Sequence, residues 1–353
     1  MTERFEAMMA LAVYEPDFVA VLQRVLRSGE TYVDAGAQLG YFAAEAARHI
    51  GHTGQMFLFE PDPRAYTRLA AHLASARPSR TPRTKLFCEA LSDHVGQGHI
   101  NMLNVMGWSQ VARASEGQPP VNHCKAAPTA EIRLTTLDTV LEAEQVEQVR
   151  LLKIDVEGHE VFVLRGARYT LGTIRPDYIL VEFNEQALAQ HGFLGRHIHA
   201  MIAHHGYRGA VLSGARIGRN SCESEPLANF LYARTEALLR EALPDLPPAV
   251  PEEEFTAEEI EAAWLEANDD DAPDVWARRI VSMAAAGQLT TAIAEGERLL
   301  DKFPDLWWFR GHLAHWLRCT GAVGRARAHY ERMLAEQPDS AEVTRILRDL
   351  GTN

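Results

Sequence analysis

The stretch that decides the fold is TYVDAGAQLGYF, which runs from Thr31 to Phe42, together with QMFLFE, which runs from Gln55 to Glu60. Each stretch holds a short apolar run typical of a buried strand, with an acid at its end. A glycine-bearing turn and an alanine-rich helix separate the two runs. Such a βαβ unit forms a nucleoside pocket at the carboxyl ends of its strands.

The charge of the turn indicates which nucleoside it binds. A pyrophosphate-binding loop reads G-x-G-x-x-G and presents backbone N–H groups to an anion. Here Asp34 stands at the entrance of the turn, followed by Gly36 and Gly40. A carboxylate at that place would repel a pyrophosphate and would suit a cofactor with an ammonium and a sulfonium. Glu60 lies 20 residues beyond Gly40, where a carboxylate can accept both ribose hydroxyls. The pattern favours S-adenosylmethionine over a nicotinamide dinucleotide.

Length and composition limit the number of domains, the class of partner and the cellular setting that we expect. A chain of 353 residues is longer than one core usually serves, so two domains are expected. The formal net charge of -13 argues against a general nucleic-acid or acidic-membrane binder. The four cysteines are scattered without a CxxC pair, which favours a reduced, cytoplasmic setting. Neither a secretion signal nor a membrane span is indicated.

A second acidic strand end follows the apolar run Val149–Ile154. It carries Asp155, Glu157, His159 and Glu160. Helix capping explains an acid at 157 or 160, but it explains Asp155 less well, because the strand carries Asp155 to the edge where ligands bind. Crowded carboxylates repel, so one of them should have a raised pKa and act as a general base, with His159 as a further candidate. The acids could alternatively hold a divalent cation through oxygen ligands. We assign no metal ligand.

Strands and helices alternate around these two segments, which predicts an open α/β sheet with helices on both faces. The last two expected strands form a hairpin-like pair that could add an antiparallel strand at the sheet edge. Further strands are expected at Lys85–Ala90, Gly96–Val111, Glu131–Leu134, Pro176–Phe183, Tyr207–Leu212 and Leu227–Ala233. Further helices are expected at Asp17–Arg27, Tyr41–Ile50, Ala65–Ala74, Leu137–Glu144 and Ile198–His205.

The pattern changes after residue 235. Residues 236–255 are rich in proline and acids and read as an extended linker. Residues 256–353 read as helical, and they match themselves with a period of 34 residues. The period and the small and proline positions resemble tetratricopeptide repeats, although Gly296 stands where an aromatic residue is expected. Helices at Ala257–Asn268 and Ala341–Leu350 are expected to cap the array. The matching pairs include Gly287 with Gly321, Ala292 with Ala326, and Pro304 with Pro338.

Residues 25 to 235 resemble the FkbM family of S-adenosylmethionine-dependent methyltransferases. The matching runs are Val33–Tyr41, Glu60-Pro61, Ala90–Asp93, Leu152–Glu160 with Val163–Ala167, and Leu180–Phe183. Two positions depart from the family pattern. Gln38 stands where an asparagine is expected, and His159 is bulky where a small residue is usual.

The resemblance implies a role for each matched residue. Asp34, Gly36 and Gly40 would hold the methionine part of the cofactor, Glu60 would take the ribose, and the turn from Ala90 to Ser92 would flank the adenine. Asp155 would lie nearest the transferring methyl group. Residues 1–235 would be a Rossmann-like methyltransferase domain that acts on hydroxyl oxygens of sugars, glycans or natural products.

The expected partners are therefore a small-molecule or glycan acceptor and, through the repeats, a protein partner or a second copy of the chain. Two other classes compete with this hypothesis. One is a non-catalytic repeat scaffold with a regulatory S-adenosylmethionine-binding domain, and the intact acids at 34, 60 and 155 argue against it. The other is a nicotinamide oxidoreductase, which the charge of the turn disfavours.

Overall fold

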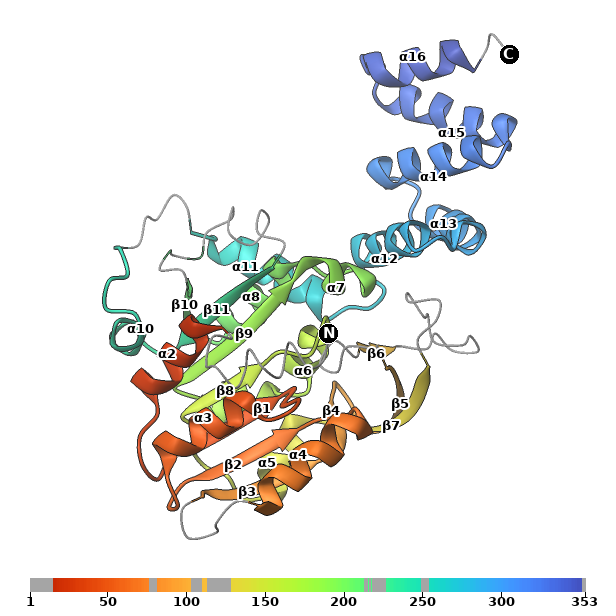
Figure 1. Ribbon diagram of the computed structural model, residues 1–353. Helices are drawn as coiled ribbons and strands as arrows, with labels where there is room; N and C mark the ends of the chain where they lie inside the picture. Colours follow the sequence, from red (N-terminus) through yellow and green to blue (C-terminus); the bar gives the residue numbers. More distant parts are fainter. Residues whose placement is uncertain are drawn as a thin grey trace. The chain divides into compact units, whose positions relative to one another are not determined.

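The computed structural model describes residues 15–75, 81–102, 110–112, 128–212, 215, 217, 227–248 and 254–350. The chain forms two compact units, and each is described by itself below (Figure 1). The first unit comprises Met1–Leu188 with Leu194–Asn268, and the second comprises Ala189–Phe193 with Asp269–Asn353.

A seven-stranded sheet forms the centre of the first unit, in the order β10-β11-β9-β8-β1-β2-β3. Strands β3, β2, β1, β8 and β9 are parallel, and β11 is antiparallel to both of its neighbours. The expected antiparallel strand thus lies inside the sheet, and β10 is the edge strand. The bounds are β1 Thr31–Ala35, β2 Gln55–Phe59, β3 Arg83–Phe87, β8 Leu151–Ile154, β9 Tyr178–Asn184, β10 Arg208–Val211 and β11 Leu227–Ala233.

Helices cover both faces of this sheet, as Figure 1 shows. On one face α2, α3 and α10 pack over a core that contains Phe18, Phe42 and Leu239. On the other face His199 of α8 contacts Tyr232 of β11, and α8 in turn packs against α6 and α11. The helix bounds are α2 Pro16–Val25, α3 Tyr41–Ile50, α4 Pro63–Ser75, α5 Leu137–Ala143, α6 Glu160–Arg165, α7 Glu185–Gln190, α8 Gly195–Ala203, α10 Glu236–Ala242 and α11 Ala257–Ala267, with a π-helix at Thr170–Ile174.

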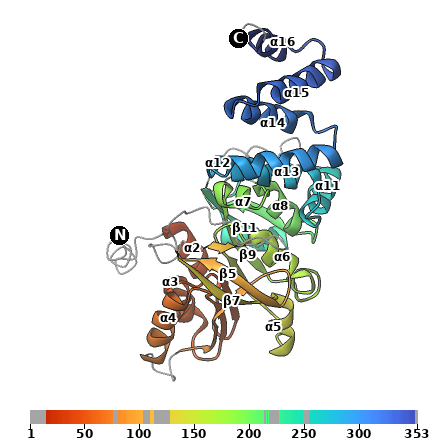
Figure 2. The same cartoon turned by 90° about the vertical axis from the view of Figure 1, so that its right-hand side faces the viewer.

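A second sheet, in the order β4-β7-β5-β6, lies beside the carboxyl ends of the central strands (Figures 1 and 2). The single strand expected at 85–90 is two strands, because the chain leaves the central sheet at Cys88 and joins the second sheet. Ile100 and Leu134 are among the residues of its small apolar core. The bounds are β4 Glu89–Leu91, β5 Gly96–Asn101, β6 Gln110–Ala112 and β7 Thr129–Thr135.

Helix α11 belongs to the first unit, although its sequence was expected to cap the repeats. Its acidic face is paired with α8. Glu266 lies 3.1 Å from Arg196 and 3.2 Å from His197, and Glu261 lies 3.2 Å from His204. Part of the acidic excess of the chain is therefore paired with polar side chains of α8.

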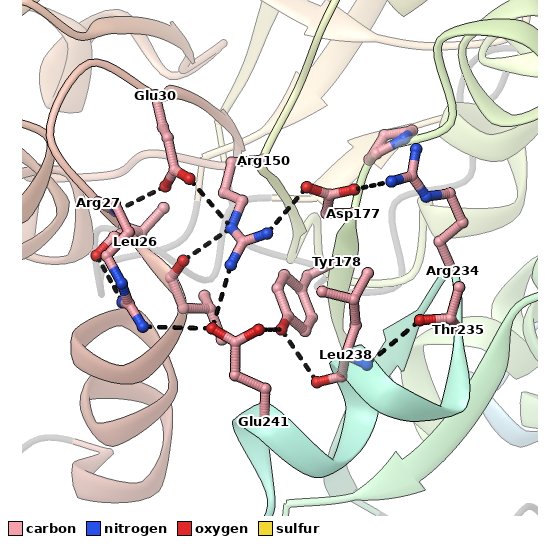
Figure 3. Close-up of polar contacts among 12 residues, drawn as sticks. Leu26, Arg27, Glu30, Arg150, Asp177, Tyr178, Arg234, Thr235, Leu238 and Glu241 are labelled. Carbon is pink, nitrogen blue, oxygen red and sulfur yellow. Dashed lines mark hydrogen bonds and ion pairs between the residues drawn. The ribbon is translucent and has the colours of Figure 1, made fainter.

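The amino ends of the central strands are joined by an ion-pair network around Arg150 (Figure 3). Its guanidinium lies 3.3 Å from Glu30, 2.9 Å from Asp177 and 3.3 Å from Glu241, and it donates to the carbonyl oxygen of Val25. These partners come from the loop before β1, the start of β9, and helices α10 and α2. The network thus holds elements together at the sheet edge opposite to the predicted site.

The second unit is wholly helical in its described part and repeats as the sequence predicts. Ala292 and Ala326 are both fully buried, and Gly287 and Gly321 both end their helices with a φ near +81° or +82°. A Cβ on Gly296 would lie 3.1 Å from the ring of Phe309, so the aromatic group comes from the neighbouring helix instead. The helices are α12 Pro273–Ala285, α13 Leu289–Lys302, α14 Trp307–Cys319, α15 Val323–Glu336 and α16 Ala341–Asp349.

Among the described residues, none of the helices combines the length and apolar character that crossing a bilayer requires.

Candidate active site

The turn between β1 and α3 is held against the end of β2. The backbone N–H groups of Gly36 and Ala37 both donate to the carbonyl oxygen of Phe59, at 3.0 and 2.9 Å. Gly36 has a φ of +88°, and a Cβ at this position would lie 1.9 Å from the carbonyl oxygen of Asp155. Glycine is therefore required at 36 both for the backbone conformation and for the close approach of the β8–α6 turn.

Glu60 follows β2 and is 5% exposed. One of its carboxylate oxygens accepts from the backbone N–H of Gln38 and the other from that of Asp62, both at 2.8 Å. Burial raises the pKa of Glu60 to about 7, and the two N–H donors oppose that rise. Each carboxylate oxygen keeps a further lone pair, so the group can still accept hydroxyl donors.

Lys153 joins the two acidic strand ends. It is the register partner of Asp34 on the neighbouring parallel strand, so both side chains leave the sheet on the same face. Its ammonium lies 3.1 Å from Asp34 Oδ1 and 3.1 Å from Asp155 Oδ2, and it donates to the carbonyl oxygen of Gly36 at 3.0 Å. Burial lowers the pKa of Lys153, but the charges of Asp155 and Asp34 outweigh burial and raise it, so the ammonium persists.

This arrangement changes the role of Asp34. Its side chain is 1% exposed, and besides Lys153 it accepts from the hydroxyl of Tyr32 at 3.0 Å. The negative charge that we placed at the entrance of the turn is thus balanced by a lysine of the same chain. Asp34 acts on the turn through Lys153, whose remaining hydrogen bond holds Gly36.

Three more carboxyl groups gather beside Asp155. Oxygen atoms of Asp155, Glu157 and Glu182 all lie within 4.8 Å of one another. Burial, then the charges of Asp155 and Glu160, raises the pKa of Glu157 to about 8. Burial, then the charges of Asp155 and Glu157, raises the pKa of Glu182 to about 10. Burial raises the pKa of Glu160 to about 7. At neutral pH this cluster holds protons or requires a cation.

Backbone strain accompanies the cluster. Glu157 has a φ of +55°, which is uncommon for a residue with a side chain, and Gly158 follows with +98°. The carboxylate of Glu160 accepts from the N–H groups of Val156 and Gly158 and so holds this turn together. A strained turn that its neighbours fix in place is typical of a functional site.

His159 faces the second sheet. It is 4% exposed, and its Nε2 lies 3.0 Å from the hydroxyl oxygen of Ser92. Its ring also packs against Phe162, with the ring centroids 4.5 Å apart. The structure therefore joins two residues that we had assigned to different roles, Ser92 to the adenine and His159 to the candidate bases.

A narrow cleft lies where these segments meet. Its walls come from the ends of β1, β2 and β8 and from β4 and β6 of the second sheet. A buried carboxylate at Glu60, a turn that only glycine can form at 36, and an apolar wall around Leu91 fit an adenosine group. The lining residues are Ala35, Gly36, Gln38, Phe59, Glu60, Pro61, Glu89, Ala90, Leu91, Val111, Asp155, Val156, Glu157 and His159.

Most of the residues chosen from sequence line this cavity or adjoin it. Gly36, Glu60, Ala90, Asp155, Glu157 and His159 line it, whereas Asp34, Gly40 and Ser92 are not among its lining residues in the described part of the chain. Gly40 ends the turn, where a Cβ would lie 2.4 Å from Leu69. Sequence reasoning missed the importance of two charged residues. It gave Lys153 no role, and it included Glu182 only in the matched run Leu180–Phe183.

The fold and site together define a Rossmann-like methyltransferase domain. A family model described as the methyltransferase FkbM domain matches residues 34–208. Residues 34–208 are therefore an FkbM methyltransferase domain. S-adenosylmethionine is its cofactor and methyl transfer is its reaction.

Solved structures show weaker similarity. Fibrillarin of Aeropyrum pernix, in complex with S-adenosyl-L-methionine, is 14% identical, with a TM-score of 0.32 over 61% of this chain and 72% of that chain. Precorrin-6y C5,15-methyltransferase of Geobacter metallireducens is 11% identical, with a TM-score of 0.32 over 61% and 87%. An S-adenosylmethionine-dependent O-methyltransferase of Thermotoga maritima is 10% identical, with a TM-score of 0.33 over 63% and 66%. No curated protein sequence matches the chain. The assignment rests on the family match.

Proposed function

We propose that the chain is an O-methyltransferase that acts on a hydroxyl group of a sugar, a glycan or a natural product. The carboxylate cluster beside the cavity is the observation that carries this proposal. A hydroxyl nucleophile must lose a proton, and Asp155 and Glu157 line one wall of the pocket, with Glu182 beside them. Glu157, with a pKa of about 8, is suited to exchange a proton near neutral pH.

When bound, S-adenosylmethionine supplies a methyl group that its sulfonium already activates. Glu60 would hold the ribose hydroxyls, Ala90 and Leu91 would flank the adenine, and the turn at Gly36 would hold the methionine part. The remaining task of the chain is to align the acceptor oxygen and to exclude water. Asp155 would orient the hydroxyl, and Glu157 would take its proton.

His159 and Ser92 support the wall that the second sheet presents. Their hydrogen bond links the α6 end of the site to β4, so His159 positions that wall in our proposal and is an alternative base. We further propose that the helices of residues 269–353 bind a protein partner or a second copy of the chain, because exposed residues such as Trp308 and Val323 lie on them.

The test combines cofactor binding with methyl transfer. Calorimetry with S-adenosylhomocysteine should show no binding to a Glu60→Ala variant and unchanged binding to an Asp155→Ala variant. Incubation with S-adenosylmethionine carrying an isotopic methyl label and a panel of hydroxylated sugars should give methyl ethers with the wild type, and none with Asp155→Ala. Glu147→Ala, an exposed acid before β8, is the matched control. Normal binding and turnover by both site variants, or transfer to nitrogen or carbon alone, would contradict the proposal.

A further inference from the structure

The acids beside the cavity come from two neighbouring parallel strands. Asp155 and Glu157 follow β8, and Glu182 lies near the end of β9, which pairs with β8 from Leu151–Tyr178 to Ile154–Val181. The carboxyl ends of both strands therefore meet at one place on the sheet edge. Their oxygen atoms gather from two separate elements, which is how protein sites for hard cations are commonly built.

The spacing of these oxygens fits a single ion. Two ligands of one ion cannot be farther apart than twice the metal–oxygen distance, which is about 4.2 Å for Mg²⁺ and about 4.6–5.2 Å for Ca²⁺. One oxygen from each of Asp155, Glu157 and Glu182 lies within 4.8 Å of the other two. The group therefore accommodates one divalent cation after a small inward movement of the carboxylates, and this movement is smaller for Ca²⁺ than for Mg²⁺ or Mn²⁺.

Glu160 provides an independent indication of a missing ligand. Its side chain is 1% exposed, and its Oε1 accepts from two backbone N–H groups of the turn. Its Oε2 is buried and has no hydrogen-bond partner within the described residues. The charge of Glu160 raises the pKa of both Glu157 and Glu182, so its carboxyl group lies near the cluster. A buried carboxylate oxygen without a donor is costly unless a cation or an ordered water compensates it.

The charges of the chain itself leave the cluster unbalanced. Asp34, Asp155, Glu157, Glu160 and Glu182 bring five carboxyl groups together. Within the described part of the chain, Lys153 is the cation that forms ion pairs with this group, and it is shared by Asp34 and Asp155. Lys153 faces Oδ2 of Asp155, so Oδ1 remains available to a metal. Asn184 hydrogen-bonds to Glu157 and holds its carboxylate at the edge of the cluster.

We propose that Asp155, Glu157 and Glu182 bind one divalent cation of the Mg²⁺, Ca²⁺ or Mn²⁺ class, whose oxygen-ligand preference matches three carboxylates. Glu160 is a neighbouring acid that compensates the charge of the ion. The sequence assigned no metal to these residues. The inference deepens the proposed function, on which it rests for its role: the ion would bind the acceptor oxygen and lower the pKa of its hydroxyl, and His159, the alternative base, would take the proton in place of Glu157.

The experiment measures Mn²⁺ binding to the full-length chain without cofactor or acceptor. After treatment with EDTA and its removal, Mn²⁺ is titrated and the signal of the free ion is followed by electron paramagnetic resonance. The wild type should bind one Mn²⁺ per chain, with a Kd below about 1 mM. Glu157→Gln and Glu182→Gln should each weaken binding by about tenfold or more, since each loses a ligand. Glu147→Gln should bind as the wild type does.

Melting curves separate loss of the site from loss of the fold. In EDTA the Glu182→Gln variant should melt at or above the wild-type temperature, because a repulsive charge is removed, and added Mn²⁺ should raise the melting temperature of the wild type and of Glu147→Gln but not that of Glu182→Gln. No loss of the free Mn²⁺ signal with the wild type, or wild-type affinity for Mn²⁺ in both glutamine variants, would overturn the metal site. Calorimetry with S-adenosylhomocysteine is run in parallel, so that failure of the cofactor site is recognised separately.

Discussion

The ammonium of Lys153 lies 3.1 Å from a carboxylate oxygen of Asp34, and both side chains are 1% exposed. The two residues are direct register partners on β1 and β8, and Lys153 also reaches Asp155 and the carbonyl oxygen of Gly36. One lysine thus connects the cofactor-binding turn to the acid cluster. A fully buried charge of this kind is tolerated only with excellent geometry, which three polar contacts near 3 Å provide.

Replacing Lys153 by methionine should destabilise the first unit by about 3–5 kcal/mol, because two acids would lose a shared buried cation. Hydrogen exchange of peptides that contain residues 31–36 and 151–156 measures this change in the first unit alone. Lys85→Met is the matched control. Lys85 pairs with Glu144 at the surface and is 44% exposed, so its loss should cost no more than about 1 kcal/mol. Equal effects of the two substitutions would refute a special role for the buried lysine.

Gly36→Ala should disrupt both the turn and the cofactor site. Its φ of +88° alone costs an alanine about 1–2 kcal/mol, and the added Cβ would collide with the carbonyl oxygen of Asp155 at 1.9 Å. Gly321 separates the two effects, since its φ is +82° but a Cβ there would meet nothing within 4 Å among the described residues. Gly321→Ala should therefore show only the conformational cost, in hydrogen exchange of its own helices. A Gly36→Ala variant that binds S-adenosylhomocysteine normally would contradict the assigned turn.

Cofactor affinity should depend on the ionisation of Glu60. The ionised carboxylate is the better acceptor for ribose hydroxyls, and the pKa of Glu60 in the free protein is about 7. Below pH 7 binding must first remove a proton, so affinity should rise with pH and level off above 7. Between pH 6 and pH 8 the Kd for S-adenosylhomocysteine should fall by about tenfold.

Glu60→Gln is the control for this pH dependence. The amide cannot ionise, so the variant should bind S-adenosylhomocysteine weakly at every pH. Its Kd should not change between pH 6 and pH 8. Calorimetry at several pH values gives both the Kd and its dependence on pH. If the slope persists in Glu60→Gln, another acid near the cavity titrates on binding, and the assignment of the ribose carboxylate fails.

Local sequence patterns predicted the helices and strands well. They did not predict contacts between segments that are distant in the sequence. The helix from Tyr41 to Ile50 and the strand from Leu227 to Ala233 have the predicted bounds, because each shows a clear apolar period with a glycine or a charged residue at its end. The break at Cys88 was not predicted, since a strand that changes sheets keeps its apolar pattern. The position of β11 inside the sheet depends on pairing with β9, which no local pattern records.

The candidate site also contains some residues that local patterns predict and others that only contacts between distant segments reveal. Glu60 and Asp155 could be found because each ends an apolar strand. The signal for Lys153 was also present, because a lysine inside the apolar run from Leu151 to Ile154 must find a buried partner. The partner of Lys153 could not be identified from the sequence, because it depends on the strand register that places Asp34 beside it. Glu182 was visible as an acid in a strand, but its nearness to Asp155 and Glu157 follows only from the order of strands in the sheet.

Arg150→Met should weaken the fold while leaving the cofactor site intact. Arg150 is 14% exposed and holds Glu30, Asp177 and Glu241 at the edge of the sheet away from the cavity (Figure 3). Its loss leaves three acids facing one another, at a cost of about 2–3 kcal/mol, between that of a surface pair and that of a fully buried pair. Hydrogen exchange of β8 and β9 measures the loss.

The matched control is Arg48→Met on α3, since Arg48 is 74% exposed and pairs with Glu45 within one helix. That change should cost less than about 0.5 kcal/mol. Affinity for S-adenosylhomocysteine should stay within twofold of the wild type in both variants. A large loss of affinity with Arg150→Met would show that this network reaches the cavity, and that stability and cofactor binding are coupled through the central strands.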